Sequence, residues 1–185
     1  MIDRILPRIC LAICRAMLAL AALAVSHQAR AEALGIHTIS DLVSHAGSMS
    51  MAGDYEFFSR PEWAGIQKAY GLAFRAQRQM QPDFMYAAVA SGEVDVIAGY
   101  TSDGLIAKYD LVALEDDRHA IPPYDAIVLL APKRADDAAL RAALSPLLGR
   151  IDIADMREAN LRAAGGDSTS SPDAVARWLW EKVGK

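Results

Sequence analysis

The stretch Val94-Asp95-Val96-Ile97-Ala98-Gly99-Tyr100-Thr101-Ser102-Asp103-Gly104 decides the fold. Its first part, from Val94 to Gly99, is apolar with little alternation, which is typical of a strand buried on both faces. A polar turn follows directly and begins with Tyr100. Because α/β proteins bind their ligands in loops at strand ends, we expect Tyr100 to face a ligand.

Around this strand the sequence alternates between strand and helix patterns, which predicts a parallel-type α/β layer. The helix expected at 82–91 has proline in its first turn and Gly92 just past its end, and Asp103 is expected to cap the segment that follows the turn. Thr38 or Ser40 is expected to cap an earlier helix. Strands are expected at 48–52, 73–77, 94–99, 111–114 and 126–131, and helices within 54–70 and at 82–91, 135–148, 153–164 and 172–183.

Two further segments share the character of the Tyr100 turn. Pro122-Pro123-Tyr124-Asp125-Ala126 places a second tyrosine beside an apolar run, and Glu56-Phe57-Phe58-Ser59-Arg60 ends in an arginine. Taken along the chain, the segments with Arg60, Tyr100 and Tyr124 resemble, in order and spacing, the E-F-x-x-R, aromatic-S-T-D-G and P-P-Y-x-A segments of the osmoprotectant-binding proteins of ABC importers. In the turn at 100–104 the Thr and Ser are exchanged relative to that family.

The resemblance implies a ligand and a site. Family members capture glycine betaine, choline, carnitine and related amines, and deliver them to a permease in the inner membrane. A quaternary ammonium is held best by aromatic faces, and a carboxylate by a guanidinium. The resemblance therefore assigns Arg60 to the carboxylate, Tyr100 and Tyr124 to the trimethylammonium group, and Thr101 to the same ligand-binding set.

The N-terminus has the pattern of a secretory signal peptide. Basic residues precede a short apolar core at 16–25, and Ala29-Arg30-Ala31 matches an A-x-A cleavage site. The mature chain is thus expected to begin at Glu32 and to lie in the periplasm; an uncleaved membrane anchor is the alternative. Both cysteines, Cys10 and Cys14, fall inside this segment, so disulfide chemistry is not expected in the mature chain.

Charge and motifs exclude several function classes. The chain has 19 basic and 23 acidic residues and a net charge of −4, and removal of residues 1–31 makes it −7. No basic stripe remains, which argues against nucleic-acid binding. Nucleophile, phosphate-loop and zinc-protease motifs are absent from the sequence, so no catalytic residue, metal ligand or cofactor is expected. The acidic run 115–117 is interpreted as a solvated loop.

The resemblance also implies the domain organisation. The expected fold is α/β and periplasmic-binding-protein-like (type II), with one near-complete lobe and an incomplete second lobe. Residues 1–31 are the signal peptide, 32–125 the ligand-binding lobe (lobe two of the family), and 126–185 the returning part of lobe one, a strand plus three helices. The opening part of lobe one has no counterpart here. Three explanations remain open: another chain supplies that part, the gene is a decayed remnant, or the chain is a truncated, non-transporting interaction protein.

Overall fold

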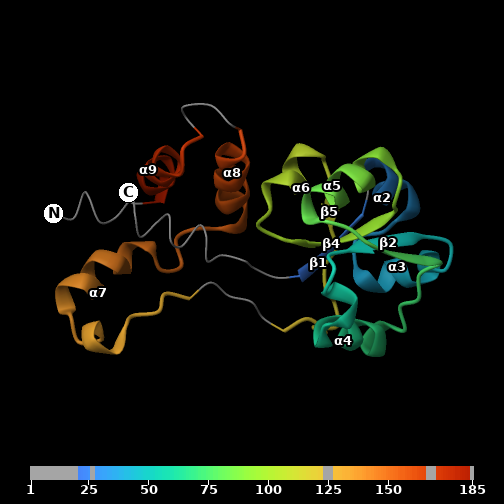
Figure 1. Ribbon diagram of the computed structural model, residues 1–185, viewed down its shortest axis with the longest axis horizontal. Coiled ribbons are helices and arrows are strands. Elements are labelled where there is room, and N and C mark those ends of the chain that lie inside the picture. The colour runs from blue at the N-terminus through green and yellow to red at the C-terminus, as the bar shows by residue number, and fades with distance from the viewer. Residues whose placement is uncertain (1–20, 26–27, 123–126, 166–169, 184–185) are drawn as a thin grey trace.

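The computed structural model describes residues 21–25, 28–122, 127–165 and 170–183, and they include a five-stranded sheet, on the right in Figure 1. The strand order is β3-β2-β4-β1-β5. β2 pairs in parallel with β3 and β4, whereas β1 pairs antiparallel with both β4 and β5. The predicted parallel-type layer is therefore present, with one antiparallel strand inserted. The strands are β1 (Ala21–Val25), β2 (Ser50–Gly53), β3 (Ala76–Gln79), β4 (Val96–Tyr100) and β5 (Val112–Ala113).

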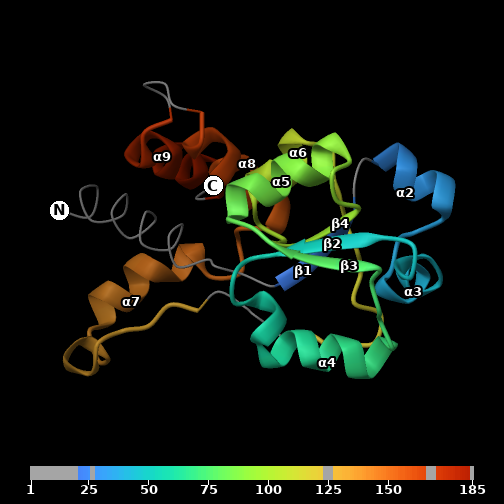
Figure 2. The ribbon, with the colours of Figure 1, turned by 45° about the vertical axis from the view of Figure 1, so that its right-hand side comes forward.

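Helices cover both faces of this sheet, as Figure 2 shows. One apolar cluster joins the sheet to α3 and α4, and a second joins it to α5 and α6. Both faces of the sheet are therefore shielded from water. This burial explains why the sequence of β4 is apolar. The helices of this part are α2 (Gln28–Leu34), α3 (Ile39–Ala46), α4 (Pro61–Tyr70), α5 (Pro82–Ser91) and α6 (Gly104–Lys108), with a 3₁₀ turn η1 (Phe57–Ser59) before α4.

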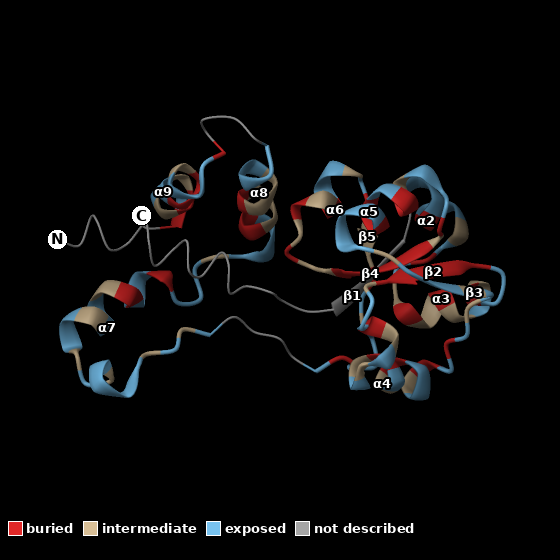
Figure 3. Ribbon diagram, in the orientation of Figure 1, coloured by how far each residue is buried: buried red, intermediate tan, exposed pale blue. Residues whose placement is uncertain are grey.

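The central strands divide their side chains between the two clusters. Val96 and Ala98 of β4 belong to the cluster under α3 and α4, whereas Ile97 belongs to the cluster under α5 and α6. This alternation is the normal geometry of a strand. On β2, Met51 and Ala52 divide in the same way. Figure 3 shows the resulting band of buried residues along β2 and β4.

Local sequence signals set the helix ends. The Thr38 hydroxyl accepts from the Asp41 backbone N–H at 3.1 Å, and the Asp41 carboxylate accepts from the Thr38 backbone N–H at 2.9 Å, which completes a capping box. Asp103 caps α6 by accepting from the Leu105 N–H at 2.9 Å. Gly92 ends α5 at a φ of 77°, a conformation that glycine adopts without strain. The predictions for Thr38, Asp103 and α5 are confirmed.

Strand ends were predicted less well than helix ends. The strand expected at 73–77 is β3, which begins at Ala76. Its start is delayed because the Arg75 backbone N–H donates to the Met49 carbonyl at 2.9 Å, in the loop before β2. The ladder between β2 and β3 then starts with Ser50 opposite Ala76. A strand end thus depends on its partner, and a single sequence does not show the partner.

The chain beyond residue 131 is helical and has an apolar cluster of its own. Helix α8 packs against α6 of the sheet-containing part. The Asn160 side-chain amide donates to the Ser102 carbonyl at 2.7 Å, and a Cβ atom on Gly104 would lie only 2.4 Å from the Leu161 backbone nitrogen. The elements are η2 (Pro132–Arg134), α7 (Ala138–Leu144), η3 (Ser145–Leu147), α8 (Ile153–Ala163) and α9 (Pro172–Val183).

The strand expected at 126–131 is absent from its described part, residues 127–131, so this prediction is corrected. Val128 and Leu130 are half-buried and pack on the C-terminal cluster, whereas Ile127 is 70% and Leu129 82% exposed. The alternation is that of a strand, but no described strand lies beside it to complete a hydrogen-bonded ladder. Residues 127–131 therefore form an extended segment with one apolar face exposed to solvent.

The N-terminal elements lie across the predicted signal-peptide cleavage position. Strand β1 falls within the expected apolar core, and the expected cut between Ala31 and Glu32 falls inside α2. Among the residues that the structure describes, no helix is both long and apolar enough to cross a bilayer. The sheet therefore includes residues that the signal-peptide prediction removes.

Candidate ligand-binding site

A cavity of about 320 Å³ lies where β2 and β4 end. These strands are parallel, so their carboxyl ends meet at the same edge of the sheet, where α/β proteins place ligands. Asp54 follows β2, Tyr100 is the last residue of β4, and Arg60 stands between η1 and α4. All three line the cavity, together with Asp103 and Tyr86.

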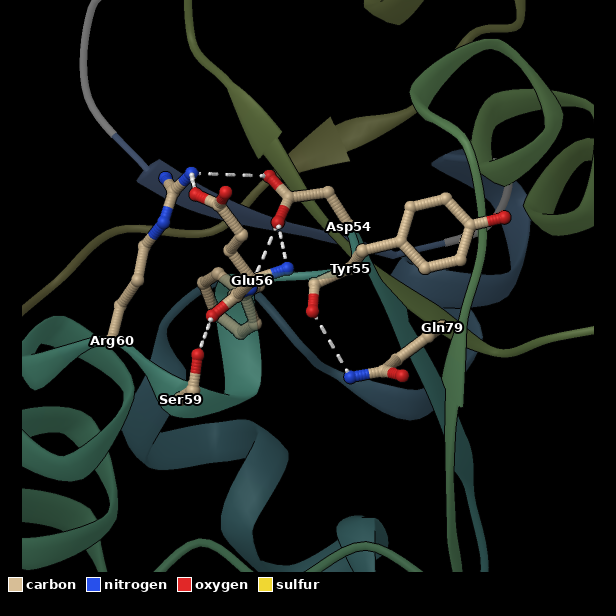
Figure 4. A network of polar contacts seen from close by, with 7 residues as sticks. Asp54, Tyr55, Glu56, Ser59, Arg60 and Gln79 are labelled. Carbon is tan, nitrogen blue, oxygen red and sulfur yellow. Dashed lines mark hydrogen bonds and ion pairs between the residues drawn. The ribbon is translucent and has the colours of Figure 1, made fainter.

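Arg60 is held by two carboxylates (Figure 4). Its Nη2 lies 3.0 Å from Glu56 Oε2 and 3.7 Å from Asp54 Oδ2. The hydrogen bond with Glu56, and after it one with the Tyr100 hydroxyl, raises the pKa of Arg60 above its ordinary value. The guanidinium is therefore a fixed positive charge with part of its hydrogen-bonding capacity already used.

The Asp54 carboxylate also shapes the backbone beside the cavity. Its Oδ1 accepts from the backbone N–H groups of Glu56 at 2.9 Å and Phe57 at 2.8 Å, which fixes the turn η1 that precedes Arg60. Its other oxygen faces Arg60. The neighbouring Tyr55 ring points away from Arg60 and is 62% exposed, so Tyr55 is not part of the site.

Tyr86 forms the buried wall of the cavity. The side chain is 1% exposed, and its hydroxyl makes no hydrogen bond within the described residues. Burial, and after it the negative charge of Asp103, raises the pKa of Tyr86 above its ordinary value. A Cβ atom on Gly99 would lie 2.8 Å from this hydroxyl, so residue 99 of β4 must be small for Tyr86 to fit.

Two of the four predicted site residues meet at this cavity. Arg60 and Tyr100 both line it. Thr101 does not, and its backbone carbonyl instead accepts a hydrogen bond from Arg157 Nε of α8. Tyr124 lies outside the described residues. The ligand-binding role of all four stays a prediction.

Sequence reasoning missed Asp54 and Tyr86 as cavity residues, and assigned Asp103 only its capping role. Asp54 had a usable signal, since it follows β2 as Tyr100 ends the parallel strand β4. Tyr86 had none, because it lies within a helix and reaches the cavity only through tertiary packing. Asp103 both caps α6 and faces the cavity.

In the part of the chain that the structure describes, which includes the acidic run 115–117, no three His, Cys, Asp or Glu side chains are grouped so that they could hold a metal ion. Asp116 is half-buried rather than solvated, which corrects the prediction for that residue. It accepts hydrogen bonds from the Tyr70 hydroxyl and from the backbone N–H groups of Ala120 and Ile121. The loop is therefore fixed by one carboxylate.

The chain matches a family model along most of its length. Residues 17–181 match the substrate-binding domain of ABC-type glycine betaine transport systems. The chain belongs to this family. Its members are solute-binding proteins of ABC importers and not enzymes; they are extracellular or periplasmic and work with ABC transporter permeases.

Relatives of this family agree with the match. A carnitine transport binding protein of Listeria monocytogenes is 28% identical over 158 residues, which cover 84% of this chain and 51% of the relative. A glycine-betaine-binding protein of Pseudomonas aeruginosa is 32% identical over 146 residues, covering 72% and 47%. The chain thus spans about half the length of the curated relatives it matches.

A solved structure gives the same result for the fold. A crystal structure described as a glycine betaine/carnitine/choline ABC transporter superposes with a TM-score of 0.78 at 30% identity, covering 89% of this chain and 59% of that one. The fold class is confirmed as that of the type II periplasmic binding proteins. The partial coverage fits one near-complete lobe and an incomplete second lobe.

Proposed function

We propose that this chain is an exported solute-binding component of an ABC importer for a quaternary-amine osmoprotectant such as glycine betaine or choline. The observation that carries the proposal is the meeting of Arg60 and Tyr100 at one cavity at the carboxyl edge of the sheet. Cation-π contact with the Tyr100 ring contributes on the order of 0.5–2 kcal/mol. Tyr124 is part of the proposal as a second aromatic contact.

The charge around the cavity supports a cationic ligand. Arg60 contributes one positive charge, whereas Asp54 and Asp103 contribute two negative charges to the lining, and Glu56 adds a third beside it. The surplus of negative charge attracts a cation. Arg60 keeps donors that can bind a ligand carboxylate, but a carboxylate competes there with Glu56 and Asp54.

In this proposal the ligand-binding lobe ends at residue 125, and residues 126–185 belong to the other lobe. The importer permease in the inner membrane is the partner that receives the ligand. Closure of two lobes on a ligand excludes water and strengthens each contact. A single lobe binds more weakly, because each lost aromatic contact of about 1 kcal/mol lowers affinity about fivefold.

The experiment is a thermal-unfolding titration of the full chain with glycine betaine, choline and carnitine. A ligand that binds only the folded state raises the unfolding midpoint in a concentration-dependent way. Tyr100→Ala should reduce the shift, whereas Tyr55→Ala, which removes an exposed tyrosine that points away from Arg60, should retain it. A cooperative transition that no amine shifts, or an equal loss in both variants, contradicts the proposal.

A second candidate is a truncated, non-transporting interaction protein derived from this family. The exposed Ile127 and Leu129 favour it, because an extended apolar face of this kind is normally covered. In that case a partner protein would cover the segment. Size-exclusion chromatography with light scattering tests this candidate. A monomer that responds to an amine would exclude it.

A further inference from the structure

The strand β1 is an interior strand of the sheet, between β4 and β5, although the sequence pattern assigns it to a signal peptide. All five of its residues are in register with β4, from Ala21 opposite Tyr100 to Val25 opposite Val96. Its other edge pairs with β5, where Ala24 lies opposite Ala113. Within the described sheet, β5 joins the other strands only through β1.

Two polar contacts attach the first half of α2 to the segments that precede β5 and β4. The Gln28 backbone N–H donates to the Asp110 carbonyl at 3.1 Å. Arg30 Nη2 lies 2.6 Å from Asp95 Oδ1, just before β4. Ala31 is fully buried, and its carbonyl accepts from the Ile36 N–H at 2.9 Å. The residues on both sides of the predicted cut therefore belong to one packed unit.

Cleavage after Ala31 would leave a gap between β4 and the edge strand β5. β4 and β5 would each lose the partner strand between them, and their backbone N–H and C=O groups on those edges would have no ladder. Unsatisfied buried backbone groups are costly, and open apolar edges promote aggregation. An N-terminal extension that folding does not require would not occupy such a place.

The segment also has a place in the candidate site. Tyr100 is the last residue of β4 and lines the cavity, and its partner in the ladder is Ala21. β1 is thus the element that supports Tyr100 on the side opposite β2. The family match begins at residue 17, ahead of both β1 and the predicted cut.

We propose that residues 21–31 remain in the folded protein, and that β1 is a positioning element that holds Tyr100 at the cavity. The second part of this proposal rests on the proposed function, and the first part does not. The A-x-A pattern at residues 29–31 is then part of helix α2 and not a processing site, so export of the chain would leave residues 21–31 in place.

Hydrogen exchange measured by mass spectrometry on the full chain tests retention directly. Peptides that cover residues 21–25 should exchange as slowly as those that cover 96–100, because both strands belong to one ladder. Fast exchange in 21–25 beside slow exchange in 96–100 would overturn the proposal. Recovery of a mature protein that starts at Glu32 and unfolds at the same midpoint as the full chain would also overturn it.

Two variants of the full chain test the same point by stability. Leu23→Pro removes a backbone N–H in the middle of β1, opposite Ala98, and Ala31→Asp places a charge at a fully buried position. Each should lower the unfolding midpoint by about 5 °C or more, or abolish the cooperative transition. Glu32→Gln, at the adjacent exposed position, is the control. Midpoints equal to that of the control would overturn the proposal.

The positioning role needs a readout separate from stability. Ala21→Pro alters only the end of β1 that faces Tyr100. It should reduce the choline-induced rise in midpoint at least threefold while the unliganded protein still unfolds cooperatively. An unchanged rise would overturn the positioning role. A full chain that responds to no amine would remove that role together with the proposed function, whereas the exchange experiment would still decide retention.

Discussion

Ser50 donates both its backbone N–H and its hydroxyl to one carboxylate oxygen of Asp95, at 2.8 and 2.9 Å. The two residues stand at the starts of the neighbouring parallel strands β2 and β4, so this double contact fixes how the strands begin side by side. The other carboxylate oxygen pairs with Arg30 of α2. One half-buried carboxylate therefore joins three elements of the fold.

Asp95→Asn should lower the free energy of unfolding by about 1–3 kcal/mol, because hydrogen bonds to a charged group are among the stronger ones. Arg30→Gln should cost less, since the arginine is partly exposed and surface ion pairs contribute little. Chemical denaturation at neutral pH measures both variants. An Asp95→Asn protein as stable as the parent would show that the double contact with Ser50 does not stabilise the sheet.

The same carboxylate predicts a pH dependence. Burial alone would raise the pKa of Asp95, but the hydrogen bonds from Ser50 and the Arg30 contact outweigh it and hold the pKa below its ordinary value of 3.8. A depressed folded-state pKa contributes stability above the unfolded pKa that is lost as pH falls through the folded value. Below about pH 4, stability should therefore fall more steeply in the parent than in Asp95→Asn. Parallel curves for the two proteins would contradict this assignment.

A second prediction about stability concerns the hydrogen bond between Tyr70 and Asp116. The Tyr70 hydroxyl donates to Asp116 and accepts from the Arg118 backbone N–H at 2.8 Å, and the residue is 4% exposed. Tyr70→Phe leaves the Arg118 N–H without this acceptor, so it should cost about 1–3 kcal/mol in denaturant unfolding. Tyr55→Phe, on an exposed ring, is the matched control and should change nothing measurable. Equal stabilities of the two variants would contradict the bridging role.

Gly104 tests the packing of α8 on α6. A Cβ atom there would lie 2.4 Å from the backbone nitrogen and 2.6 Å from the Cα of Leu161, and backbone atoms do not give way as side chains do. Gly104→Ala should therefore destabilise by about 2 kcal/mol or more, or separate α8 from α6. Gly47→Ala is the control, because no atom lies within 4 Å of its Cβ and its φ is −61°. Limited proteolysis reports separation of α8, and equal behaviour of the two variants would exclude the close contact.

The parts of the fold that sequence predicted well are those with local signals. Pro82 and Gly92 mark both ends of α5, and Thr38 with Asp41 marks the start of α3. β1 had no such signal. A short apolar run after basic residues and before an A-x-A pattern is typical of a signal peptide. That this run forms a strand becomes visible only from its pairing with β4, more than seventy residues later in the chain.

The candidate site likewise contains residues that the sequence was sufficient to select and residues that it was not. Arg60 and Tyr100 stand in short motifs at predicted element ends, so the sequence was sufficient to select them. Tyr86 reaches the cavity from within the apolar core of α5, where periodicity predicts only packing. Its position depends on a small residue, Gly99, on the neighbouring strand. Such a pair is visible only once both elements are placed.

The carboxylate of Asp54 should determine the relative affinities of the site for a cationic ligand and for a ligand with a carboxylate. It faces Arg60 at 3.7 Å and lines the cavity, so it attracts a cation and competes with a ligand carboxylate for the guanidinium. Asp54→Asn keeps the oxygen that caps η1 but removes the charge. It should weaken choline binding about fivefold, roughly 1 kcal/mol, and weaken glycine betaine binding less, because Arg60 becomes more available to the carboxylate.

Isothermal titration of both amines measures the ratio of the two affinities. Asp136→Asn, an exposed change outside the cavity, alters the net charge of the protein equally and should leave that ratio unchanged. A fall in choline affinity of the same size in both variants would assign the effect to the overall charge of the protein. Equal loss of choline and betaine affinity in Asp54→Asn alone would mean that the carboxylate shapes the turn before Arg60 and does not select ligand charge.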